Sequence, residues 1–113
     1  MSHNVVHFEI NGPDKAALQQ FYGDAFDWTV NADNPMGYGL VEHDQASAGI
    51  GGGIDEGSGV TIYIEVDDPA AALERVKELG GTVVEEVSSN PMVTLAKFAD
   101  PAGNVIGLVK SEG

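Results

Sequence analysis

The chain has 113 residues, enough for one domain that buries a core without disulfides or a structural metal. It carries 18 acidic and 5 basic residues, a formal net charge of -13. Nucleic acids and anionic membrane surfaces bind basic surfaces, so we expect neither as a partner. The acidity fits a well-solvated surface or the attraction of a cationic ligand. The absence of cysteine excludes disulfides, a thiol nucleophile and a cysteine-ligated metal.

The first ten residues have neither a basic flank nor a long apolar run, so we expect no signal peptide. No stretch approaches the roughly 18 consecutive apolar residues that a membrane span needs. We therefore expect a cytoplasmic protein.

The first half predicts a strand, a helix and three further strands. Alternation over 5–10 indicates the opening strand, and Asp14 can cap the helix that follows. Three strands are predicted over 28–31, 36–43 and 48–54, followed by a loop over 55–59. The helix carries an apolar stripe at i, i+3 and i+4 spacing, formed by Leu18, Phe21, Tyr22, Ala25 and Phe26.

The second half repeats this order at an offset of roughly 54 residues. A strand over 59–66 leads to Asp68, an N-cap, with Pro69 at the first helical position. The helical stripe is Leu73, Val76 and Leu79, and Gly80-Gly81 ends the helix. Strands over 82–87, 92–98 and 105–109 complete the unit. We interpret the chain as a single domain, 1–113, with duplicated βαβββ modules at about 4–54 and 59–110. A ferredoxin-like βαββαβ fold would leave two strands unexplained.

Side chains alternate across each strand, which separates two faces. His7 and Glu9 share one face of the opening strand, and Thr61 and Tyr63 share the corresponding face in the second module. Gly107 lies on that face of the last strand. The opposite faces are apolar and suit packing against the helices. A curved sheet with its helices outside would turn the polar faces toward a concave interior.

Several segments in this order resemble the vicinal oxygen chelate superfamily, also called the glyoxalase/bleomycin resistance/dihydroxybiphenyl dioxygenase group. The segments are HFEINGPDKAALQQFYGDAFDW, VDDPAAALERVKELGGTV, GIGGGI and DPAGNVIGLV. The resemblance implies an α+β fold in which two tandem βαβββ modules form a curved, cup-like mixed sheet with helices on the outer face. It also implies a homodimer.

Metal-using members of this superfamily place divalent-ion ligands on the first and last strands of both modules. The resemblance places four residues at those positions: His7, Gly53 (or Gly51 in another register), Thr61 and Gly107. Only His7 suits a metal, whereas a catalytic zinc, nickel or iron site needs about three protein ligands. We therefore predict no cofactor and interpret Gly107 as a vacated ligand position that leaves room in the cavity. A divalent metal held by substitutes is the alternative, with Glu9, Glu65 and His43 as candidates.

The other motifs in the sequence give little evidence of a binding or catalytic role. The glycine run 49–53 is no phosphate cradle, because the acidic stretch 55–59 follows it and a lysine does not. No serine lies in a nucleophile-elbow motif, which leaves hydrolase chemistry without support. His7 could serve as a general base or a hydrogen-bond donor, or could be an interior histidine bonded to a neighbour.

Together these features predict a protein that binds a small organic molecule in a concave cavity without a metal, as the drug-sequestering members of the group do. The predicted cavity residues are His7, Glu9, Tyr38, Thr61, Tyr63 and Gly107. The alternative is an enzyme of the same superfamily. It would be a lyase or isomerase working through His7 and Glu9, or a dioxygenase-type enzyme with His7 as a metal ligand.

Overall fold

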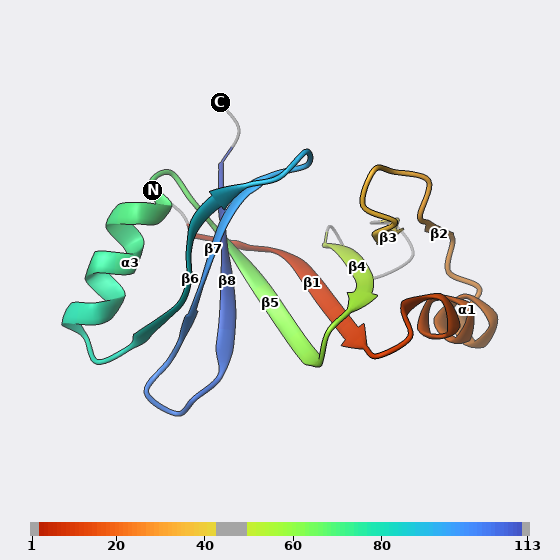
Figure 1. The fold of residues 1–113 in the computed structure, drawn as a ribbon, viewed down its shortest axis with the longest axis horizontal. Helices are drawn as coiled ribbons and strands as arrows, with labels where there is room; N and C mark the ends of the chain where they lie inside the picture. The colour runs from red at the N-terminus through yellow and green to blue at the C-terminus, as the bar shows by residue number, and fades with distance from the viewer. Residues whose placement is uncertain (1–2, 43–49, 112–113) are drawn as a thin grey trace. The chain divides into compact units, whose positions relative to one another are not determined.

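The computed structural model describes residues 3–42 and 50–111 (Figure 1). It divides into two compact units. The first is Val6–Ile62, and the second is the rest of the described chain. His43, which the sequence suggested as a substitute metal ligand, lies outside the described residues.

The first unit contains the first βαβββ module. Its elements are β1 (Val5–Gly12), α1 (Lys15–Phe26), β2 (Val30–Asn31), β3 (Gly39–Val41) and β4 (Gly51–Glu56). The strands lie in the order β2-β3-β4-β1. β1 and β4 are parallel, whereas β4 and β3, and β3 and β2, are antiparallel. Because a parallel pair joins an antiparallel meander, the sheet is mixed.

The second module repeats the arrangement. Its elements are β5 (Gly59–Val66), α3 (Pro69–Glu78), β6 (Thr82–Ser89), β7 (Thr94–Ala99) and β8 (Val105–Lys110). The order is β5-β8-β7-β6, with β5 parallel to β8 and the other pairs antiparallel. The predicted α+β class and the duplicated βαβββ order are thus confirmed.

Several predicted strand boundaries differ from the structure, and two of the differences arise at turns. The strand predicted over 36–43 is reduced to β3, because the side chain of Asn34 draws residues 36–38 into a turn. Part of the loop predicted over 55–59 belongs instead to β4 and β5, which are joined by a tight turn at Gly57. Residues 51–53 of the glycine run lie in strand β4, which agrees with the prediction that this run is not a phosphate-binding loop.

Both helices begin at the predicted caps. The Asp14 carboxylate accepts from the backbone N–H of Ala17 at 3.2 Å, and the Asp68 carboxylate accepts from that of Ala71 at 3.1 Å. Each bond satisfies a donor that the first helical turn leaves unpaired. Neither of these helices is long and apolar enough to cross a membrane, nor is any other helix in the described part of the chain.

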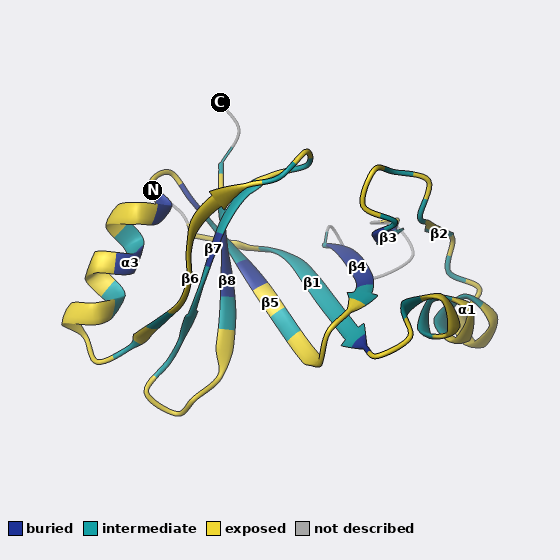
Figure 2. Ribbon diagram, in the orientation of Figure 1, coloured by how far each residue is buried: buried dark blue, intermediate teal, exposed yellow. Residues whose placement is uncertain are grey.

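The core of the second unit lies between α3 and its sheet (Figure 2). Its buried members are Val66, Leu73, Ala96 and Leu108. Leu73 is 2% exposed, but Leu79 is 65% exposed, so the predicted α3 stripe packs at its start and not at its end. The helix ends at Glu78, before this position is reached.

The α1 stripe packs less completely than predicted. No residue of α1 is buried, and Phe21 and Phe26 are 60% and 59% exposed. Their rings lie against Tyr22 and Trp28, which are half-buried. Helical spacing places these aromatics on one face, but it does not determine what covers that face.

The turn before β8 is organised by Asp100. Its carboxylate accepts from the backbone N–H groups of Ala102 and Asn104, both at 2.9 Å, and from the Asn104 side chain at 3.0 Å. Gly103 has a φ of 92°, which favours glycine. The hydrogen bonds from Asn104, above all from its side chain, hold the pKa of Asp100 below its ordinary value, because they stabilise the charged form.

This depressed pKa predicts an acid-dependent contribution to stability. The contribution is present above the ordinary aspartate pKa of about 4 and is lost as the pH falls through the lower folded-state value. An Asp100→Ala variant should therefore be less stable than wild type at pH 7, and the gap should narrow toward pH 2. Urea unfolding across this range measures the gap, and a gap that does not change with pH would contradict the assignment.

Candidate functional site

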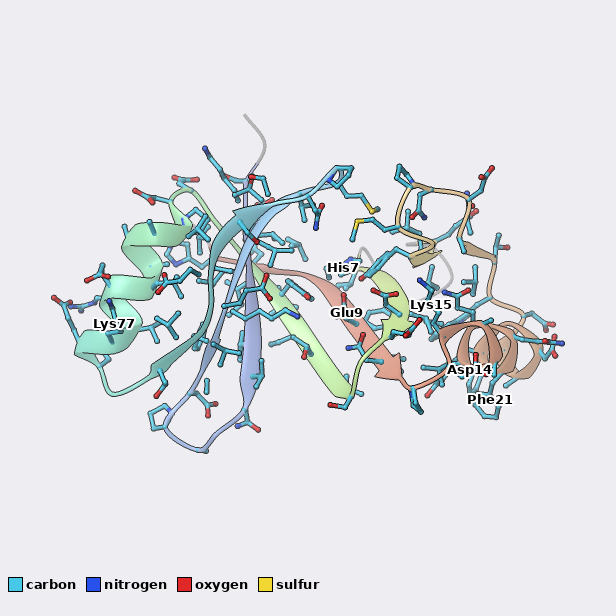
Figure 3. The ribbon with its side chains drawn as sticks, viewed as in Figure 1. His7, Glu9, Asp14, Lys15, Phe21 and Lys77 are labelled. Atoms are coloured by element: carbon cyan, nitrogen blue, oxygen red, sulfur yellow. The ribbon has the colours of Figure 1, made fainter. Side chains whose placement is uncertain are left out.

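The first unit has two chemically different sheet faces. Phe8 on β1 points toward the α1 side, where its ring centroid lies 6.2 Å from that of Trp28. Residues on either side of Phe8 point the opposite way because strand side chains alternate. His7 and Glu9 therefore share the face away from α1, as predicted (Figure 3). We call this the site face of the first unit.

Tyr38 links the two polar residues of the site face. Its hydroxyl donates to the Glu9 carboxylate at 2.8 Å and lies 2.7 Å from Nε2 of His7. The Tyr38 and His7 rings are stacked, with an interplanar angle of 24°. Tyr38 is 8% exposed. The three side chains thus form one hydrogen-bonded chain, Glu9–Tyr38–His7.

The turn before β3 fixes the position of Tyr38. The Asn34 side chain accepts from the backbone N–H groups of Met36 and Tyr38, and donates to the Tyr38 carbonyl at 2.7 Å. From α1, Lys15 donates to the carbonyl of Met36, and Gln19 donates both to that of Gly37 and to that of Ile54 on β4. Polar contacts on both sides of the turn therefore hold the tyrosine over the sheet.

Gly53 provides the surface on which the Tyr38 ring lies. It pairs with Glu9 across β1 and β4. A Cβ atom placed on Gly53 would overlap the hydroxyl end of Tyr38. Any side chain at this position would displace the ring, so the glycine is required by the close approach of the tyrosine.

The second unit contains a corresponding pair. Tyr63 pairs with Gly107 across β5 and β8, in the same register as Glu9 with Gly53. This register identifies Gly53, not Gly51, as the counterpart of Gly107. A Cβ atom on Gly107 would overlap the Tyr63 ring, which is 4% exposed. The prediction that Gly107 leaves room in a cavity is therefore wrong, because a tyrosine ring occupies that space.

The predicted site residues fall into two groups. His7, Glu9, Tyr38 and Gly53 come together in the first unit. Tyr63 and Gly107 come together in the second. Thr61 is half-buried in β5, near the end of the first unit. Glu65 follows on β5, where it pairs with Val109.

The sequence reasoning missed the role of Asn34. The signal was the tripeptide Asn-Pro-Met, which occurs at 34–36 and again at 90–92. Asn90 also accepts from two backbone N–H groups of its turn, those of Met92 and Val93. The repeat therefore marks a side-chain-stabilised turn at an equivalent place in each module.

The residues at the superfamily's ligand positions do not fit a divalent metal. Gly53 and Gly107 offer no ligating atom, and tyrosine rings fill the space beside them. Within residues 3–42 and 50–111, no three His, Cys, Asp or Glu side chains are grouped closely enough to hold a metal ion. A catalytic site of the zinc type needs about three such ligands.

Solved structures with the same fold span nearly the whole chain. A glyoxalase/bleomycin resistance protein/dioxygenase superfamily member from Vibrio splendidus 12B01 is 22% identical, with a TM-score of 0.64, over 96% of this chain and 98% of that one. A hypothetical protein from Bacillus halodurans C-125 is 16% identical, with a TM-score of 0.73, over 100% and 97%.

Methylmalonyl-CoA epimerase from Mycobacterium tuberculosis is also similar in fold. It is 16% identical, with a TM-score of 0.67, over 96% of this chain and 88% of that one. At these identities the likeness establishes the fold and leaves activity open.

Sequence comparison places the chain in a family. Among curated proteins, none matches it. The sequence model of the glyoxalase-like domain matches residues 7–109, which extend from within β1 to within β8. This match, the duplicated βαβββ fold and the related structures agree, and the chain belongs to the glyoxalase-like domain family of the vicinal oxygen chelate superfamily.

Proposed function

We propose that this protein binds a small organic ligand on the site face of the first unit, and that it does so without the divalent metal of its metal-using relatives. The observation that supports the proposal is the packing of tyrosine rings against Gly53 and Gly107. Two of the superfamily's ligand positions are thereby taken by aromatic packing. A ligand would have to be held by the side chains that remain.

The side chains of the site face suit that task. Small-molecule sites combine apolar walls with a few well-placed polar groups. Here Glu9 and His7, which are half-buried, supply a carboxylate and an imidazole, and the buried Tyr38 holds them together. The net charge of -13 adds a long-range attraction for cationic compounds. A positively charged or hydrogen-bond-donating organic molecule is the class that this chemistry favours.

A second candidate is a metal-independent lyase or isomerase. The Glu9–Tyr38–His7 chain favours it, because a histidine oriented by hydrogen bonds is a common general base. Several solved structures of the same fold are epimerases by name. A shared fold does not indicate a shared substrate, so their substrate is not assigned to this chain. A dioxygenase-type reaction with His7 as a ligand would need further metal ligands that the described residues do not supply.

A homodimer is part of the proposal. The exposed Phe21 and Phe26 rings give α1 an apolar surface that a second copy could cover. Light scattering on the intact chain measures the assembly directly. A particle of 11.8 kDa at all concentrations would remove the dimer from the proposal.

Metal content provides the first test. Protein purified without chelators should contain far less than one metal ion per chain, and incubation with nickel, zinc, manganese or iron followed by desalting should not change this. Elemental analysis of wild type and His7→Ala measures the content. A stoichiometric ion that disappears in His7→Ala would overturn the metal-free proposal.

Ligand binding provides the second test. In a thermal-shift screen of aromatic, thiol-conjugated and cationic compounds, we expect cationic aromatics to raise the melting temperature most. Binding at 100 times Kd stabilises the folded state by about 2.7 kcal/mol. The shift should be lost in Glu9→Gln and retained in Asp24→Asn, which removes a charge from the exposed side of α1.

Analysis of the compound after incubation separates the two candidates. A compound that returns intact indicates a binding protein, and one that is consumed only by protein with His7 indicates an enzyme. Equal shifts for wild type and Glu9→Gln would contradict binding at the site face.

A further inference from the structure

We propose that Lys15 is a positioning residue of the site, whose ammonium group holds the turn that carries Tyr38 against α1 and β4. The Tyr38 hydroxyl contacts both Glu9 and His7, so a shift of this turn would move the hydroxyl away from the two polar groups. The inference rests on the proposed function in one respect, which is that a ligand meets these groups.

The Lys15 ammonium group connects α1, the turn before β3, and β4. Lys15 is the first residue of α1 and extends toward β4 (Figure 3), where Nζ lies 3.6 Å from a carboxylate oxygen of Asp55. Nζ also donates to the Met36 carbonyl in the turn, at 3.1 Å. A Cβ atom placed on Gly37 would lie 3.1 Å from Nζ. The ammonium group therefore lies directly against the backbone of the turn.

Helix formation does not explain the place of Lys15 in α1. The N-terminus of a helix is the positive end of the helix dipole, where cations are disfavoured. In α3 the cations Arg75 and Lys77 lie in the last turn, where they are favoured, and the first residue is Pro69. Lys15 is also the only lysine or arginine among residues 6–62. Its contacts with the turn and with β4 offset its unfavourable place in the helix.

The second module provides an internal comparison. Its Asn-Pro-Met turn is held by the Asn90 side chain, as the first is by its own asparagine. Pro69 stands at the position of Lys15, directly after the N-cap, and its side chain has no hydrogen-bond donor. Four residues after the asparagine the second module has Thr94, where the first has Tyr38. The lysine therefore accompanies the turn that carries the site tyrosine.

Gln19 and Asn34 hold the same turn independently of Lys15. Gln19 lies one helical turn after Lys15 and donates to the carbonyls of Gly37, at 3.4 Å, and Ile54, at 2.8 Å. The Asn34 side chain holds the turn from within. Loss of the ammonium group should therefore loosen the turn without unfolding the protein.

Amide hydrogen exchange of the full-length chain, followed by NMR, tests the inference without a ligand. The variant is Lys15→Met, which keeps an apolar stem and removes the ammonium group. The backbone N–H groups of Met36 and Tyr38 should exchange about tenfold faster, because a hydrogen bond from a charged donor is lost. Those of Met92 and Val93 in the second turn should be unchanged. Equal acceleration in both turns, or none in the first, would overturn the proposal.

Should Lys15→Met not fold, exchange in the wild-type protein decides. The two N–H groups that the first asparagine holds should then exchange more slowly than the two that the second asparagine holds. Equal or faster exchange in the first turn would refute the positioning role.

Binding of benzyltrimethylammonium, a cationic aromatic probe, separates positioning from simple electrostatics. Removal of a positive charge should by itself strengthen the binding of a cation. Loss of positioning acts in the opposite direction, so Lys15→Met should raise the Kd of the probe about fivefold, the effect of one weakened hydrogen bond. Lys110→Met, which removes an exposed charge in the second unit, should leave Kd unchanged or lower it. Unchanged or tighter binding by Lys15→Met would contradict the proposal.

These outcomes are separable from those of the ligand screen. A protein that binds no compound but shows faster exchange confined to the first turn of Lys15→Met retains the positioning role of Lys15. A protein whose binding of the probe depends on Glu9 but not on Lys15 retains the proposed function and loses this inference.

Discussion

Close packing of a tyrosine ring against a strand glycine is the interaction on which the arrangement of polar and aromatic side chains in each unit depends. Without a Cβ atom, Gly53 and Gly107 let the rings of Tyr38 and Tyr63 lie directly on the sheet. A glycine within a strand costs about 0.5–1 kcal/mol relative to alanine, and an aromatic side chain that covers it can offset this cost by its burial. In the first unit the same packing brings the Tyr38 hydroxyl between Glu9 and His7.

This packing changes the structural role that we assign to Gly53 and Gly107 on the closing strands of the two modules. From the superfamily pattern they resemble ligand positions that have lost their side chains. In the structure they are occupied positions, filled by aromatic rings from the same unit. A glutamate placed at Gly107 would have to displace Tyr63 before it could reach a metal. We therefore expect that a glutamate at Gly53 or at Gly107 would also require a change of the tyrosine that lies against it.

The sequence predicted the features that depend on local chemistry or on strand alternation. The caps at Asp14 and Asp68, the duplicated modules and the shared face of His7 and Glu9 are of this kind. Tyr38 was predicted as a site residue, but its contacts were not. They join residues 29 and 31 positions apart, and they depend on a turn whose side-chain bonds no periodic pattern reveals.

The exposed fraction of the helix side chains was predicted least well, because it depends on which other elements pack against each helix face. Leu73 is 2% exposed and Phe21 is 60% exposed, although each belongs to an apolar stripe of its helix. Helical spacing identifies residues that share a face, whereas burial depends on what lies against that face. For the same reason the sequence could locate Gly107 on the face of β8 away from the helix but could not reveal that the Tyr63 ring lies over it.

The coupling free energy between Gly107 and Tyr63 tests the central claim most directly. It is measured by urea unfolding of wild type, Gly107→Ala, Tyr63→Val and the double variant. A ring that lies on Gly107 predicts that Gly107→Ala destabilises the protein by about 1–3 kcal/mol, as overpacking does, and that Tyr63→Val removes most of this cost. If Gly107 faced open space, alanine would be neutral or stabilising and the coupling would be near zero, which would contradict the account.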